Sequence, residues 1–229
     1  MRIAVLIAAS VLVGGCSQEA GRDAGQTGPS LSAPTSTTTS TPRTATSAPA
    51  TPAKPPEAGA KIAEVIAFIE AGRPADAGQF HTATRDGVTT QLGNDVAFTT
   101  PSGKTRCMTD SKHFDGALAC LVDLTIPPLQ PPDVYGQWKG GWVDYEGASL
   151  EIGSVHGDPG RFNSGTGPQL PYGQSLAFGD YRCRSDEVGL YCVNYAHQSA
   201  ARFSDEGIVP YGCLQKVTPP ADIGEKYSC

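Results

Sequence analysis

The sequence predicts a mainly β fold: a disulfide-stapled β-sandwich or partly open barrel with one short N-terminal helix, preceded by a signal peptide and a disordered tether. Short runs of β-branched and aromatic residues alternate with glycine and proline beyond residue 96. Six cysteines follow residue 100, an even number. The composition also changes near residue 57, where a stretch rich in Ser, Thr, Pro and Ala ends.

The first sixteen residues have the layout of an export signal. Arg2 precedes a short apolar run, and two glycines and Cys16 follow it. The run is too short for a membrane-spanning helix, which needs about 20 apolar residues. The segment Val13-Gly14-Gly15-Cys16 resembles a lipobox, in which the cysteine thiol carries the lipid. We therefore expect residues 1–15 to be a lipoprotein signal peptide, and Cys16 to anchor the chain to the extracytoplasmic face of the cell membrane. The alternative is an ordinary cleaved signal that leaves Cys16 free.

Residues 16–56 are predicted to be a lipid-anchored, disordered tether. Nearly every residue from 30 to 56 is Ser, Thr, Ala or Pro, and the first aromatic residue is Phe68. Such a segment has no apolar surface to offset the entropy lost on ordering. Its expected role is only to let the domain extend away from the membrane. Residues 57–229 are predicted to form a single β-rich domain.

One amphipathic helix is expected at the start of this domain. Ile62, Val65, Ile66 and Ile69 follow the spacing that aligns side chains on one helix face, and the helix should end near Gly72-Arg73-Pro74. We expect it to pack on the sheet. A mobile helix at the membrane surface is the alternative, but Lys61 and Arg73 make a poor basic face.

Strands are expected between the turn signals that follow. Pro101-Ser102-Gly103 predicts a tight turn between two strands, and Asp186-Glu187-Val188-Gly189 predicts a second hairpin. The proline-rich segment 127–132 is excluded as a central strand, because proline donates no ladder hydrogen bond. The predicted strands are 96–99, 105–109, 118–125, 148–152, 175–184, 189–194 and 200–204.

The cysteines beyond Cys16 predict disulfide bonds, because an even number in an exported chain favours oxidised pairs. Six cysteines allow fifteen pairings. Pairs of sequence neighbours fit local hairpins best. A metal site is disfavoured, because no CxxC pair and no close histidine accompany the cysteines; no cofactor is expected either. The predicted pairs are Cys107 with Cys120, Cys183 with Cys192, and Cys213 with Cys229.

The charge of the chain argues against a nucleic-acid partner. The formal net charge is −6, and removal of Arg2 with the signal peptide makes it −7. Phosphate backbones are bound by clustered Lys and Arg, and the sequence shows no basic stripe. Besides the membrane lipid, the expected partner is an envelope protein, glycan or lipid, bound by a monomer.

The domain contains a series of distinctive motifs: Phe98-Thr99-Thr100-Pro101-Ser102-Gly103-Lys104-Thr105-Arg106-Cys107, then Cys120, Leu170-Pro171-Tyr172-Gly173, Phe178-Gly179-Asp180-Tyr181-Arg182-Cys183 and Gly189-Leu190-Tyr191-Cys192. Together these motifs resemble a family of actinobacterial secreted proteins and lipoproteins of unknown function. The resemblance covers roughly residues 96–205, and the whole chain is similar to mycobacterial lipoproteins. It implies an exported location and a disulfide-bonded β domain, but no catalytic residues. Lys104, where asparagine is usual, and the additional Cys213 and Cys229 depart from the family pattern.

An aromatic cluster is the first candidate binding site. It contains Tyr135, Trp138, Trp142 and Tyr145, with glycines between them. If exposed, these rings suit stacking on a sugar or a protein partner. If buried, the two tryptophans complete the core, which is the interpretation we favour.

A histidine and a nearby aspartate form the second candidate site. His156 and Asp158 lie two residues apart, so the carboxylate is close enough in sequence to orient an imidazole for general-base chemistry, although such residues are more often part of a plain turn. His197 either hydrogen-bonds near the core or joins a polar site with His156. Asn163-Ser164-Gly165-Thr166-Gly167 lacks the lysine of a phosphate loop and is expected to be a flexible loop.

Two functions are compatible with these features. The first is a non-catalytic, membrane-anchored binding module of the cell envelope. The second is an envelope hydrolase that uses His156 and Asp158. We favour the first, because the sequence contains no nucleophile elbow, HExxH or Walker motif.

Overall fold

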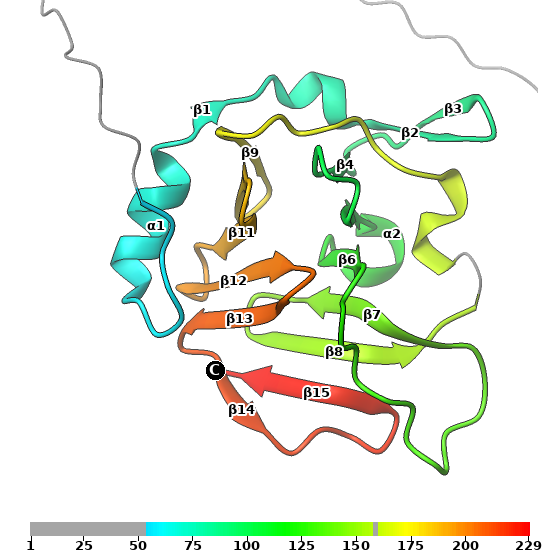
Figure 1. The fold of residues 1–229 in the computed structure, drawn as a ribbon. Coiled ribbons are helices and arrows are strands. Elements are labelled where there is room, and N and C mark those ends of the chain that lie inside the picture. The colour runs from blue at the N-terminus through cyan, green and yellow to red at the C-terminus, as the bar shows by residue number, and fades with distance from the viewer. Residues whose placement is uncertain (1–53, 158–159) are drawn as a thin grey trace, which may run out of the picture. The chain divides into compact units, whose positions relative to one another are not determined.

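The computed structural model describes residues 54–157 and 160–229, and its mainly β fold confirms the predicted fold class (Figure 1). Most strands belong to two open sheets that face each other as a sandwich, and the described strands form no closed barrel. Sheet 1 has the order β1 (Arg73–Pro74), β9 (Gln174–Phe178), β10 (Tyr181–Asp186), β11 (Gly189–Asn194), β12 (Ser199–Ser204) and β13 (Gly207–Gly212). Sheet 2 has the order β14 (Gln215–Val217), β15 (Ile223–Ser228), β8 (Ser149–Val155), β7 (Trp138–Tyr145), β6 (Leu118–Val122), β5 (Thr105–Thr109) and β4 (Ala97–Thr99).

The main core lies between the two sheets. Alternate residues of each strand point inward, as the two-residue period of a strand requires. On sheet 2, for example, Leu118 pairs with Tyr145 and Tyr145 with Leu150, and all three are fully buried. Sheet 1 contributes Leu190 and Phe203, which are paired neighbours on β11 and β12. Both sheets therefore bury one complete apolar face.

All three predicted disulfide pairs are confirmed. Cys107 and Cys120 are directly opposite each other on β5 and β6. Cys183 and Cys192 are opposite each other on β10 and β11. Each of these disulfides lies on the inner face of its own sheet, in the main core. The third disulfide joins the segment after β13 to the chain end after β15, and so connects sheet 1 with sheet 2. Its cysteines are Cys213 and Cys229.

The predicted helix is confirmed as α1 (Ile62–Glu70), which covers the outer face of sheet 1 (Figure 1). Val65, Phe68 and Ile69 are buried against β11 to β13. Gly72 lies immediately beyond the helix, where a Cβ atom would approach Ser175 to 3.0 Å. The missing side chain lets the helix end pack directly on the sheet.

The segment before α1 also contacts this face, through Pro56. The hydroxyls of Tyr191 and Tyr211 donate to the Pro56 carbonyl, at 3.2 and 3.3 Å. Pro56, the last residue of the segment predicted to be tether, therefore contacts the domain. Cys16, the signal peptide and the rest of the tether lie outside the described residues. Within the described ranges, no helix has the length and apolar character needed to cross a bilayer.

A third layer covers part of the outer face of sheet 2. It consists of the hairpin of β2 (Thr82–Arg85) and β3 (Val88–Gln91) and the 3₁₀ helix η2 (Gly160–Ser164). Phe162 of η2 and Ala83 of β2 pack with Trp142 in a second apolar cluster. Gly165 touches β2 so closely that a Cβ atom would overlap the Thr84 carbonyl. The predicted flexible loop at residues 163–167 is therefore wrong in part, since Thr166 forms a β-bridge with Thr84.

The strand predictions fail at several places. Residues 175–184 form two strands rather than one, because a turn at Gly179-Asp180 separates β9 from β10. The strand that starts at Leu118 ends at Val122 rather than at residue 125. The sequence patterns also do not predict β1, β2 and β3, which precede residue 96, or the strands beyond residue 206. They also miss β7, whose Gly140-Gly141 pair interrupts the apolar alternation. The other predicted strands agree with the structure to within a few residues, and residues 127–132 form no strand.

Candidate functional site

The end cleft is a depression of about 470 Å³ at one end of the sandwich. Four segments that are distant in sequence form its walls: the short helix α2 (Ser111–Phe114) and the turns between β7 and β8, β9 and β10, and β11 and β12. Its lining residues are His113, Phe114, Asp115, Ala117, Glu146, Asp180, Tyr181, Asn194 and His197. The cleft therefore forms only when the fold brings these four segments together.

Helix α2 is held in place by its caps. The Asp110 carboxylate accepts a hydrogen bond from the His113 backbone N–H at 3.1 Å, as an N-cap residue does. The same carboxylate lies 2.8 Å from Nδ1 of His113. Burial alone would raise the pKa of Asp110, but its hydrogen bonds with His113 lower it. At the other end, Asp115 adopts the left-handed conformation with φ 52°.

Three buried hydroxyl groups, those of Tyr145, Tyr181 and Ser199, form hydrogen bonds beside the cleft. The Tyr181 hydroxyl donates to the Tyr145 carbonyl at 2.8 Å. The Ser199 hydroxyl donates to the Gly147 carbonyl at 2.6 Å, and lies 2.7 Å from the Tyr145 hydroxyl. Because the single Ser199 proton is already donated, Tyr145 must be the donor of the second bond. Burial raises the pKa of Tyr181 to about 12 and also raises that of Tyr145, so both phenols stay protonated at neutral pH.

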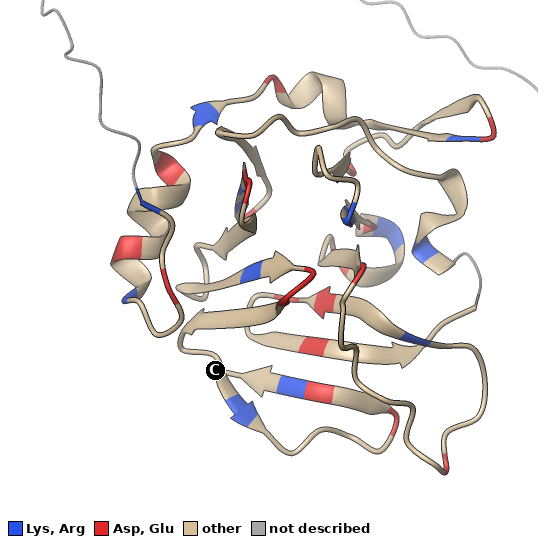
Figure 2. Cartoon of the chain, in the orientation of Figure 1, with Lys and Arg blue, Asp and Glu red and all other residues tan. Residues whose placement is uncertain are grey.

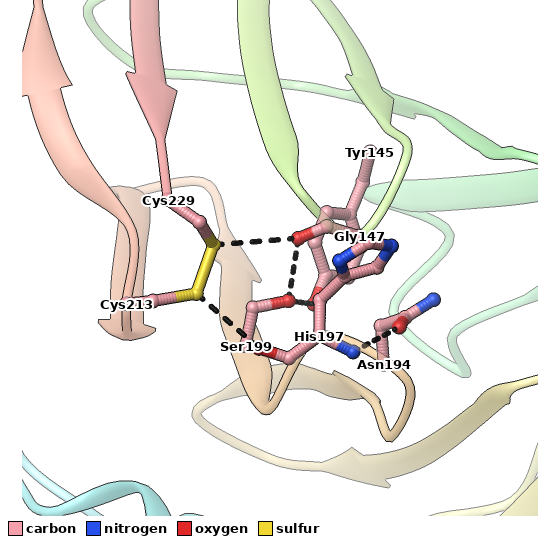
Figure 3. Close-up of a disulfide and its surroundings, with 7 residues drawn as sticks. All are labelled: Tyr145, Gly147, Asn194, His197, Ser199, Cys213 and Cys229. Atoms are coloured by element: carbon pink, nitrogen blue, oxygen red, sulfur yellow. Dashed lines mark hydrogen bonds between the residues drawn. A yellow bond between two sulfur atoms is a disulfide. The ribbon is translucent and has the colours of Figure 1, made fainter.

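The third disulfide lies beside Gly147, Ser199 and His197, as Figure 3 shows. The Cys213 sulfur lies 3.3 Å from the His197 carbonyl, and the Cys229 sulfur lies 4.0 Å from the Gly147 carbonyl. Gly147 has φ +90°, and a Cβ atom there would approach both His197 and Asn194 to 2.7 Å. The close approach at Gly147 thus holds the β7–β8 turn against the β11–β12 turn, and residues of both turns line the cleft.

The lining of the cleft favours a hydrogen-bonding ligand. Three carboxylates can accept hydrogen bonds, the Asn194 amide can both donate and accept, and the two imidazoles can do either. Phe114 adds a ring that is 44% exposed. Elsewhere, acidic and basic residues are interspersed over the strands and turns (Figure 2). No group of three or more His, Cys, Asp or Glu side chains among the described residues is arranged to hold a metal ion.

The predicted aromatic cluster does not form one surface patch. Trp142 and Tyr145 are completely buried, on opposite faces of sheet 2, whereas Tyr135 is 88% exposed. Trp138 is half-buried, and its indole N–H donates to the Pro128 carbonyl at 2.9 Å. The favoured interpretation as core is therefore confirmed for Trp142. The four rings cannot bind one ligand together, because strand alternation directs neighbouring side chains to opposite faces.

His156 stacks on Trp142, with ring centroids 3.6 Å apart. Its Nε2 lies 2.7 Å from the Ser154 hydroxyl and 3.8 Å from the Asp144 carboxylate. Burial, together with the positive charges of Arg161 and Lys139, lowers the pKa of His156 to about 4. The imidazole is therefore neutral at pH 7 and a weak base. Asp158, its predicted partner, lies outside the described residues.

Asp144 connects this histidine to the surrounding charges. The Trp142 indole N–H donates to one carboxylate oxygen at 2.9 Å, and Arg161 pairs with the other at 3.0 Å. Burial raises the pKa of Asp144 despite this pairing. The Arg161 guanidinium also stacks 3.5 Å from the ring centre of Phe114. The sequence offers no signal for this arrangement, because its members lie on four separate segments.

His197 and His156 do not form the predicted joint polar site. His197 approaches Gly147, just before β8 begins, whereas His156 follows the end of β8. A seven-residue strand separates them, which at ~3.3 Å per residue corresponds to more than about 20 Å. His197 is also exposed rather than buried, and it belongs to the end cleft.

Comparisons of the chain with protein-family models, curated proteins and solved structures yield no match. The resemblance to actinobacterial lipoproteins therefore stays a prediction.

Proposed function

We propose that the chain is an exported lipoprotein, held at the extracytoplasmic face of the membrane by a lipid on Cys16, whose domain binds an envelope glycan in the end cleft. The observation that carries the proposal is the cleft itself. It is an open depression of about 470 Å³ that combines carboxylates, an amide, imidazoles and one exposed aromatic ring. Concave sites with a few convergent polar groups are where small ligands bind.

The chemistry of the lining favours a glycan over a lipid. Sugar hydroxyls both donate and accept hydrogen bonds, so the carboxylates of Asp115, Glu146 and Asp180 can accept hydrogen bonds from them. The exposed face of an aromatic ring such as Phe114 can pack against the apolar face of a sugar. A lipid acyl chain would instead require an apolar interior, and this cleft is lined mainly by polar and charged side chains.

The support beneath the cleft is also consistent with binding. Hydrogen bonds of the buried Tyr181, Tyr145 and Ser199 hydroxyls, together with the close contact at Gly147, connect the segments that form the cleft walls. A site that is already in its bound geometry loses less conformational entropy on binding. Preorganisation of this kind favours affinity for a ligand of matching shape.

The test is calorimetric titration of the full-length lipoprotein, in neutral detergent, with oligosaccharides released from the envelope of the cells that produce it. Asp180→Asn removes one charged acceptor from the cleft and should weaken binding about tenfold, the usual effect of losing a hydrogen bond to a charged group. Glu187→Gln is the matched control. It also removes one exposed carboxylate, but from the turn at the opposite end of β10.

The proposal fails if no oligosaccharide fraction binds, or if Asp180→Asn and Glu187→Gln have equal effects. Binding of a peptide in place of a glycan, with the same response to the two variants, would keep the site and replace the ligand class. Mass spectrometry of the native protein tests the anchor separately. A mature chain that begins at an acylated Cys16 is expected, and an unprocessed start or an unmodified thiol would refute it.

A hydrolase is the second candidate, because the Ser154 hydroxyl lies 2.7 Å from Nε2 of His156. In a Ser-His-Asp triad the carboxylate binds the other imidazole nitrogen, whereas Asp144 approaches the same one. A neutral imidazole with a pKa of about 4 is also a poor general base at pH 7. A screen on ester, glycan and peptide substrates decides between the two functions: activity that disappears in His156→Gln would favour the hydrolase.

A further inference from the structure

A second depression, the basic pocket, lies on the outer face of sheet 2. It has a volume of about 280 Å³. Three of its lining side chains are basic, and none is acidic, although the chain as a whole has a net charge of −6. It shares no residue with the end cleft. The lining residues are Arg85, Arg106, Leu121, Lys139, Phe162, Gly165 and Thr166.

Two layers of the fold bring these cations together. Arg106 on β5 is paired with Leu121 on β6, so the guanidinium and the apolar side chain are neighbours on the outer face of the sheet. Arg85 comes from the third layer, at the end of β2. Close packing of Gly165 on the Thr84 carbonyl holds that strand against the segment that follows η2. The pocket thus forms where the third layer packs on sheet 2.

The two arginines have different degrees of pairing. Nε of Arg106 is buried and has no hydrogen-bond partner within the part of the chain that the structure describes. Arg85 donates to the Asn163 carbonyl at 3.2 Å and lies 3.6 Å from Asp86, a largely exposed carboxylate. A buried donor without a partner costs free energy, and a bound acceptor would recover it. The pocket therefore has donors available for an anion.

We propose that the basic pocket binds a phosphate ester. Guanidinium groups form paired, charge-assisted hydrogen bonds with phosphate oxygens, and two guanidinium groups can bind one phosphate from different sides. Leu121 and Phe162 provide apolar surface for the organic group of the ester. The ester can be a soluble metabolite or the headgroup of an anionic lipid, which share this chemistry. This site is independent of glycan binding in the end cleft.

The test is calorimetric titration of the full-length protein, in neutral detergent, with three probes. These are inorganic phosphate, glycerol 3-phosphate and short-chain phosphatidylglycerol, with glycerol as the uncharged control. We expect saturable binding of both esters, and of inorganic phosphate more weakly because it lacks the organic group. Binding of phosphatidylglycerol alone would assign the site to a lipid headgroup, and equal binding of the soluble ester would assign it to free ligands.

Arg106→Gln and Arg85→Gln should each weaken ester binding about tenfold or more, because each removes charge-assisted hydrogen bonds. Arg106→Lys keeps the charge but loses the fork geometry, so its affinity should fall between those of the wild type and Arg106→Gln. The matched control is Arg73→Gln, which removes an exposed arginine from the edge of sheet 1. It should leave binding unchanged.

Equal affinity in wild type and both glutamine variants would overturn the proposal, and so would the absence of saturable binding by every probe. Thermal unfolding of each variant shows whether it is folded. If Arg106→Gln does not fold, Arg85→Gln decides alone, because its side chain is half-exposed and outside the core. Loss of glycan binding in Asp180→Asn would leave this result unaffected, so the two proposals can fail separately.

Discussion

His156 should make the stability of the domain depend on pH, and the structure predicts the direction. In the folded protein its pKa is lowered from 6.5 to about 4, chiefly because the imidazole is buried against Trp142. Between these two pH values the unfolded chain binds a proton that the folded protein does not. Stability from this residue is therefore fully present above pH 6.5, and it is lost as the pH falls toward 4.

The size of the effect follows from the difference between the two pKa values. Each pH unit corresponds to about 1.4 kcal/mol, which sets an upper limit of about 3 kcal/mol for His156. The His156 side chain is 22% exposed to solvent, so water screens part of its interactions with the neighbouring charges. We therefore expect the wild type to lose about 1–2 kcal/mol of unfolding free energy through this residue between pH 7 and pH 4.5.

The assay is urea unfolding of wild type and His156→Gln at several pH values between 7.5 and 4.5. Glutamine has no charge in this range, so the variant differs from the wild type only in that residue 156 no longer titrates. Asp144, whose pKa is raised by burial, titrates in both proteins and its contribution largely cancels in their difference. The stability advantage of the wild type should shrink as the pH falls. Parallel pH profiles for the two proteins would refute the reasoning.

The remaining predictions concern the disulfides and the outer layer of sheet 2. Mild reduction followed by alkylation should label Cys213 and Cys229 first, because Cys229 is exposed while the other two disulfides are buried; labelling of all six cysteines at one rate would contradict this. Replacing both by serine should lower the unfolding free energy by about 3 kcal/mol in the chain-entropy model, measured by urea unfolding with the wild type as reference. Trp142→Ala should lower it by about 3–5 kcal/mol, because the side chain is completely buried, and retention of wild-type stability would show that the indole is not core. Gly165→Ala should separate β2 from the segment after η2 and raise amide exchange at Thr84, whereas unchanged protection there would show that the close contact is not needed.

Local features of the sequence were sufficient for the helix, the hairpin turns and the disulfide pairs. The spacing of Ile62, Val65 and Ile69 specifies one helix face regardless of what covers it. Cys183 and Cys192 lie on either side of a turn signal, so a hairpin places them opposite each other without help from the rest of the fold. In each case the relevant partners lie within about twenty residues along the chain.

Strands that depend on distant partners were not predictable in this way. In β7, Gly141 packs so closely against Val122 that no side chain fits, and the resulting glycine pair hides the strand pattern. In β13, Pro210 is tolerated because this strand lies at the edge of sheet 1. Neither feature indicates a strand until the neighbouring strand is known.

By itself, the sequence determined that this protein has a disulfide-bonded β domain with one amphipathic helix, because propensity, turn chemistry and hydrophobic period act between near neighbours. Only the tertiary structure decided that Trp142 is core, that His197 and Glu146 share a cleft, and that Arg85 and Arg106 share a pocket. Those outcomes depend on strand order and on the packing of layers, which bring together residues as far apart as β2 and η2. Burial and convergence are properties of the assembled sandwich, and a one-dimensional pattern does not contain them.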